Sequence, residues 1–99
     1  MRLNQKHIDI IRAMARLCFG DDAKVWLFGS RVNDAAKGGD IDLYIEADGT
    51  PAECLKREMK FYANLQRQLG LQRIDIVVHR RGTPMRRIDE EARRTGAPL

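Results

Sequence analysis

The chain has 99 residues, of which 43% are hydrophobic and 32% are charged, and its formal net charge at pH 7 is +4. This length allows one hydrophobic core, so we expect a single domain over residues 1–99. The mild positive charge favours an anionic ligand or partner but is too weak to predict nucleic acid binding. No apolar run approaches the ~20 residues that a membrane span needs, and no apolar signal-peptide core follows the N-terminus. We therefore expect a cytoplasmic protein with no membrane contact.

Helix and strand signals alternate in the first half of the chain. Apolar residues at helical spacing, with Asn4 as the N-cap, predict a first helix over residues 4–18. The short β-branched and aromatic segment 24–28 predicts a buried strand, and the segment from Ile41 to Glu46 predicts a second strand. A short helix over residues 31–37 is expected between the two strands.

The second half contains a clear helix start. The capping box Thr50-Pro51-Ala52-Glu53 opens a long helix that ends at Gly70. A third strand is expected over residues 73–79, and a last helix begins at Thr83-Pro84 and ends at Gly96. The resulting order predicts an α+β domain with a small mixed three-stranded sheet packed with helices. The long helix is expected to bury one apolar stripe, made of Leu55, Met59, Tyr62 and the residues from Leu65 to Leu69.

Three aspartates lie in the two most apolar strands. Asp40 and Asp42 are two residues apart and share one face of their strand, while Asp75 lies in the third strand. Aspartate is disfavoured in strands, and three acids brought together repel one another. A bound divalent cation would offset this cost, because carboxylate oxygens are the ligands that Mg²⁺ prefers. The alternative is a half-exposed sheet whose acids pair with arginines, which explains one aspartate better than three.

The combined motif resembles that of the DNA polymerase β-like nucleotidyltransferase superfamily. It comprises Phe28-Gly29-Ser30-Arg31, then Gly39-Asp40-Ile41-Asp42-Leu43, then Ile74-Asp75-Ile76. The resemblance is greatest to the minimal nucleotidyltransferases, stand-alone domains that are often the antitoxin partners of HEPN-domain toxins. Many of these relatives have serine where this chain has Gly39, so a hydroxyl near the expected metal site is missing but no metal ligand is.

The resemblance implies a polymerase β-like nucleotidyltransferase fold and a two-metal mechanism. Asp40 and Asp42 would bridge two Mg²⁺ ions, and Asp75 would bind the catalytic metal and help to take the proton of the acceptor. Gly29 would let the backbone approach the triphosphate, with ATP as the expected donor. Ser30 and Arg31 would contact its phosphate oxygens.

Three functions follow as hypotheses. The first is adenylylation of a hydroxyl on a HEPN toxin, because a chain of this size has no second domain to present an acceptor. The second is an antitoxin that neutralises its partner by binding alone. The third is nucleotidyl transfer to a small molecule such as an aminoglycoside, with an oligomer building the acceptor pocket. The sequence leaves the nucleotide preference and the oligomeric state open.

The remaining signals are weaker. Cys18 and Cys54 have neither metal-site nor disulfide spacing and are expected to be buried reduced thiols. Trp26 is expected in the core, and His79 at the end of its strand is expected to be structural, although it shares a face with Asp75. The C-terminal arginines are expected to lie on a solvated helix face and to pair with acids of the same helix. The alternative is a docking surface for an acidic protein or RNA. These residues are Arg80, Arg81, Arg86, Arg87, Arg93 and Arg94.

Overall fold

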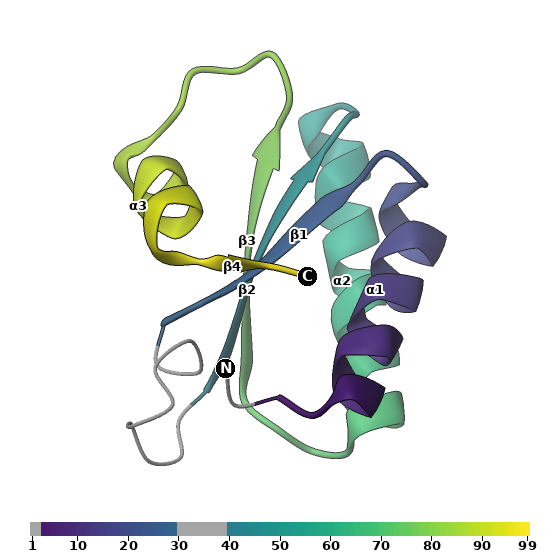
Figure 1. The fold of residues 1–99 in the computed structure, drawn as a ribbon. Coiled ribbons are helices and arrows are strands. Elements are labelled where there is room, and N and C mark those ends of the chain that lie inside the picture. The colour runs from purple at the N-terminus through teal and green to yellow at the C-terminus, as the bar shows by residue number, and fades with distance from the viewer. Residues whose placement is uncertain (1–2, 30–39) are drawn as a thin grey trace.

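The computed structural model describes residues 3–29 and 40–99. Its elements follow one another along the chain as α1 (Gln5–Phe19), β1 (Lys24–Phe28), β2 (Ile41–Ala47), α2 (Pro51–Leu69), β3 (Ile74–Arg80), α3 (Arg87–Thr95) and β4 (Ala97–Pro98) (Figure 1). The short helix expected over residues 31–37 lies outside the described residues. No helix in the described ranges is long and apolar enough to cross a membrane.

The four strands form one mixed sheet in the order β3-β2-β1-β4. Strand β1 is antiparallel to both β2 and β4, whereas β2 and β3 run parallel. The α+β class is confirmed, but the expected count of three strands was wrong. The fourth strand has only two residues, one of them Pro98, and so short a segment shows no periodicity that sequence reasoning can detect.

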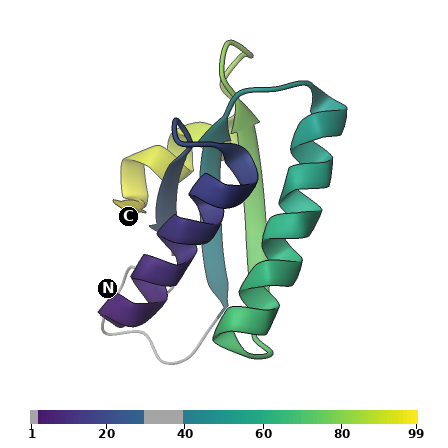
Figure 2. The same ribbon diagram turned by 90° about the vertical axis from the view of Figure 1, so that its right-hand side faces the viewer.

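Helices α1 and α2 lie side by side on one face of the sheet, and α3 lies on the other (Figures 1 and 2). The alternation predicted for the strands is confirmed: Ile41, Leu43 and Ile45 of β2 belong to the core beneath α1 and α2. The ends of α1 and α2 are also close to their predicted positions. The Asn4 side chain accepts a hydrogen bond of 2.8 Å from the His7 backbone N–H, and α1 begins at the next residue, Gln5.

Helix α2 begins at the predicted capping box. The Thr50 hydroxyl accepts from the Glu53 backbone N–H at 3.1 Å, and the Glu53 carboxylate accepts from the Thr50 backbone N–H at 2.9 Å.

Both cysteines are free and buried, as expected.

The buried stripe predicted for α2 was largely wrong. Leu55, Met59 and Tyr62 are 58%, 65% and 44% exposed, whereas the helix buries Cys54, Phe61 and Leu65. The sequence of α2 carries two apolar stripes, and periodicity alone does not say which one faces the core. Packing against α1 decides it, because Phe61 meets Phe19 edge to face with ring centroids 5.5 Å apart.

Helix α3 is held to the sheet by an arginine that covers two aromatic rings. The Arg93 guanidinium lies 5.5 Å from the Trp26 ring centroid and 5.6 Å from that of Tyr44. Its Nε donates to the Tyr44 hydroxyl at 3.2 Å, and its Nη2 pairs with Glu46 and contacts the His79 ring. Trp26 is therefore half-buried beneath α3 rather than in the main core. His79 is buried and contacts Thr83 and Arg93, which agrees with the structural role expected for it.

A fully buried carboxylate fixes the start of α3. Asp89 accepts hydrogen bonds from the Arg86 backbone N–H at 2.7 Å and from the Arg86 Nε and Nη2 at 2.9 Å. Burial by itself would raise the pKa of Asp89, but the side-chain and backbone hydrogen bonds from Arg86, together with its charge, outweigh burial and hold this pKa below its ordinary value. The helix starts at Arg87, later than the expected Thr83-Pro84, because this clamp sets the N-cap at Arg86.

We predict that Asp89→Asn lowers the free energy of unfolding by about 2 kcal/mol near neutral pH, because a buried charge-assisted hydrogen-bond set is lost. A depressed carboxyl pKa contributes stability that is present above the unfolded value of about 4 and is lost as the pH falls through the folded value. Urea unfolding of both proteins at several pH values should therefore show a constant difference above about pH 5 that shrinks on acidification below about pH 4. A difference that persists unchanged in strong acid would contradict the assignment.

Candidate functional site

Asp42 and Asp75 face each other across the parallel pair of strands. The register of β2 with β3 places Asp42 opposite Asp75. Asp40 precedes Asp42 by two residues in the chain. Both aspartates lie on the face of the sheet away from α1 and α2. The contacts of α3 with this face involve Tyr44, Glu46 and His79 further along the strands.

The two carboxyls are electrostatically coupled. Burial raises the pKa of Asp42 above its ordinary value, and the charges of Asp75 and Asp40 and a side-chain hydrogen bond to Asp75 raise it further. The nearby Arg73 opposes this shift only in part. The negative charge of ionised Asp42 is therefore only partly compensated by its neighbours, and a cation bound beside Asp42 and Asp75 would stabilise it.

Asp40 is engaged by an arginine that the sequence reasoning missed. Its Oδ2 lies 3.3 Å from the Arg73 Nε, and both side chains are substantially exposed. The Ile41 backbone N–H donates to the Arg73 carbonyl at 3.0 Å, which locks this end of the strand pair. The signal was present in the sequence: Arg73 precedes Asp75 by the same two residues that separate Asp40 from Asp42, so parallel pairing brings Arg73 beside Asp40.

Over residues 3–29 and 40–99, no group of three or more His, Cys, Asp or Glu side chains is arranged to hold a metal ion. The register nevertheless brings the three predicted ligands near one another along two adjacent strands. Asp42 and Asp75 meet, while Asp40 pairs with Arg73. Their roles as metal ligands and catalytic groups remain predictions.

Gly29 makes room for Asp42. Its φ is +76°, and a Cβ added there would lie 2.2 Å from the Asp42 Oδ2. The adjacent Phe28 is the register partner of Asp42, so the end of β1 passes directly beside this carboxylate. The structure therefore gives a packing reason for glycine at this position, and its role in the approach of the triphosphate stays a prediction. Ser30 and Arg31, the other predicted nucleotide-binding residues, lie outside the described residues.

A cavity of about 430 Å³ opens beside Asp75. Asp75 and its neighbours Ile74 and Ile76 form the β3 wall. The opposite wall belongs to α2 and consists of Glu58, Met59 and Tyr62. His79, the other polar residue considered on this strand face, is four residues from Asp75, or about 13 Å along a strand.

A family model described as polymerase beta, nucleotidyltransferase matches residues 21–97. The chain belongs to this family. The matched range includes β1, the three aspartates and the cavity beside Asp75, so the described site lies inside the part that defines a nucleotidyltransferase. Searches of curated proteins and of solved structures found no significant match.

Gly29→Ala should remove nucleotidyl transfer and lower stability by more than about 1–2 kcal/mol, the usual cost of a left-handed backbone at a residue with a Cβ. The added cost comes from the clash with Asp42. The matched control is Gly82→Ala, whose φ is +86° but whose Cβ would meet nothing within 4 Å. Thermal unfolding and an activity assay on both variants make the comparison, and equal behaviour of the two would show that Asp42 does not depend on Gly29.

Asp42→Asn should stabilise the metal-free nucleotidyltransferase by up to about 1 kcal/mol, because it removes a repulsion between partly solvated carboxylates. Thermal unfolding in EDTA measures the effect. Asp48→Asn provides the opposite case, since Asp48 pairs with Arg81 at 3.0 Å and its neutralisation removes an attraction. A lower melting temperature for Asp42→Asn in EDTA would mean that the carboxylate is held by favourable contacts.

Proposed function

We propose that this nucleotidyltransferase transfers AMP from ATP to a side-chain hydroxyl of a partner protein, and that the partner is a HEPN-domain toxin neutralised by the modification. The observation that carries the proposal is the pairing of Asp42 with Asp75 under mutual repulsion. Such a pair costs stability, and a protein that only binds its partner gains nothing from that cost.

The chemistry of the donor atoms suits a divalent cation, and this is the part of the proposal that rests on residue type rather than on a site preformed among the described residues. Carboxylate oxygens from Asp42 and Asp75, with Asp40 beside them, are hard ligands of the kind that Mg²⁺ takes. Asp40 is held by an exposed ion pair with Arg73, and exposed pairs contribute only about 0–1 kcal/mol, so its carboxylate can be released to a cation at little cost. When bound, Mg²⁺ would neutralise charge on the triphosphate and on the leaving pyrophosphate.

The residues of the chain would then position the reacting groups. The acceptor oxygen forms a bond to the α-phosphorus of ATP, the bond from that phosphorus to the bridging oxygen breaks, and pyrophosphate leaves. Asp75 is the exposed member of the pair, and we assign to it the removal of the proton from the acceptor hydroxyl. Gly29 keeps the end of β1 clear of Asp42. Most of the rate acceleration in such a site comes from positioning and electrostatics.

We infer that another protein presents the acceptor. Among the described residues, the cavity between α2 and β3 is open to solvent rather than enclosed around a small molecule. A protein partner supplies both the hydroxyl and the missing wall. This argument favours protein adenylylation over transfer to an aminoglycoside.

Intact-mass spectrometry of a co-expressed HEPN partner tests the proposal. The partner should gain whole AMP units with the wild type and none with Asp42→Asn, while Asp21→Asn, an exposed turn residue, should behave as wild type. An unmodified partner in a stable, neutralised complex would replace the proposal with neutralisation by binding alone. Modification of an added aminoglycoside instead would favour the small-molecule reading.

A further inference from the structure

Helix α2 carries a second apolar stripe that the core does not use. Leu55, Met59 and Tyr62, here called the α2 stripe, recur at i, i+4 and i+7, which places them on one face of the helix. Single exposed apolar residues are ordinary on protein surfaces, but a contiguous exposed row marks an interaction site.

The α2 stripe continues into the candidate active site. Met59 and Tyr62 form one wall of the cavity whose other wall contains Asp75. Strand β3 is at the edge of the sheet, with β2 as its neighbour on one side. A protein seated on the α2 stripe therefore lies against this edge of the sheet, next to the cavity that Asp75 lines.

Positive charge runs along one side of the α2 stripe. Lys56, Lys60 and Arg67 are exposed and recur at i, i+4 and i+11, so they form a cationic row adjacent to the stripe. None of the three forms an ion pair within residues 3–29 and 40–99. The complementary surface is an apolar patch bordered on one side by Asp or Glu residues.

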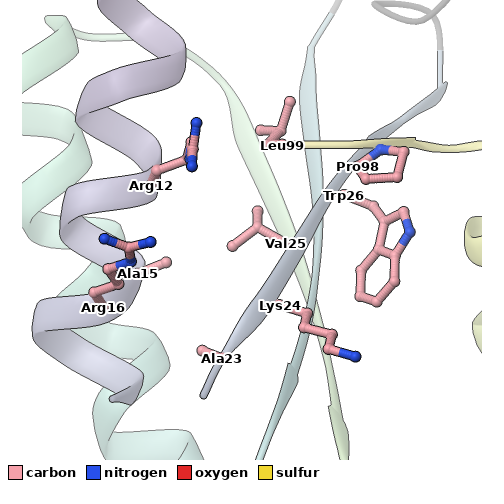
Figure 3. A pocket seen from close by; sticks show the side chains of 9 residues that line it. All are labelled: Arg12, Ala15, Arg16, Ala23, Lys24, Val25, Trp26, Pro98 and Leu99. Carbon is pink, nitrogen blue, oxygen red and sulfur yellow. The ribbon is translucent and has the colours of Figure 1, made fainter. Parts of the chain in front are cut away.

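A second hollow, of about 190 Å³, lies at the opposite edge of the sheet between α1 and β1. Arg12 and Arg16 reach it from α1, and the indole of Trp26 is turned away from that helix (Figure 3). None of the three aspartates lines it. A partner bound there would be separated from Asp75 by β1 and β2, so this hollow does not serve the transfer reaction.

We propose that the protein bearing the acceptor hydroxyl docks on the α2 stripe, with its apolar patch on Leu55, Met59 and Tyr62 and its acidic border on the cationic row. The assignment of this occupant rests on the proposed function. The docking places the acceptor beside the cavity that Asp75 lines.

The test compares two changes of an exposed apolar residue to glutamate, one on the α2 stripe and one on α1. Met59→Glu puts a charge on the α2 stripe, and Leu17→Glu puts the same charge on an α1 residue of nearly equal exposure, 67% against 65%. Binding of each variant to the co-expressed partner is measured by isothermal titration. We expect Met59→Glu to raise the dissociation constant of the complex by at least about tenfold, as for a central interface residue. Leu17→Glu should match the wild type.

A charge reversal tests the cationic row separately. Lys56→Glu combined with Lys60→Glu should slow association with the partner, and added salt should slow association of the wild type while affecting the variant less. Stopped-flow measurement of the association rate at two salt concentrations reads this out. Equal salt dependence of the association rates of the two proteins would overturn the proposal that acidic residues of the partner face the cationic row.

Binding and modification are read independently, so the two proposals fail in different ways. A wild type that binds through the α2 stripe but adds no AMP removes the proposed function and keeps the docking surface. A Met59→Glu variant that binds and modifies the partner as well as Leu17→Glu does removes the docking surface and keeps the function. Sedimentation of the chain alone tests whether a second copy occupies the α2 stripe. A wild-type dimer that Met59→Glu dissociates would show that it does, and would overturn the proposal.

Discussion

The parallel pairing of β2 with β3 is the constraint on which the rest of the site depends. One register places Asp40 beside Arg73, Asp42 opposite Asp75, and Glu46 opposite His79. Because side chains alternate at every residue, a shift of either strand by one position would turn its central carboxylate toward the core beneath α1 and α2. The hydrophobic residues between the aspartates therefore do two tasks: they anchor the sheet, and they hold the acids on the opposite face.

Sequence reasoning recovers those features that are encoded locally. The alternation of Ile41, Leu43 and Ile45 with aspartates predicts both the strand and its faces, and the capping box at Thr50 predicts the start of α2. Such signals depend on neighbours a few residues apart, and the physical chemistry of a turn or a pleat is enough to interpret them.

The features that escaped prediction depend on contacts between distant segments. The choice between the two stripes of α2 is made by Phe19, which lies 42 positions before Phe61 in the chain. The late start of α3 depends on how deeply Asp89 is buried, and the ion pair of Asp40 depends on a register that no single segment contains. The site residues themselves could be named from the motif, whereas the electrostatic balance among them required the assembled sheet.

The attachment of α3 gives the protein an internal reporter. Among its nine residues, α3 buries only Asp89 and Ala92, so its hold on the sheet is mostly ionic and aromatic rather than hydrophobic. An element with so little apolar burial opens at a lower free energy than the core beneath α1 and α2. Trp26 is the chain's sole tryptophan and lies under Arg93. Its fluorescence therefore changes when α3 lifts from the sheet, which makes local opening visible in solution before the core unfolds.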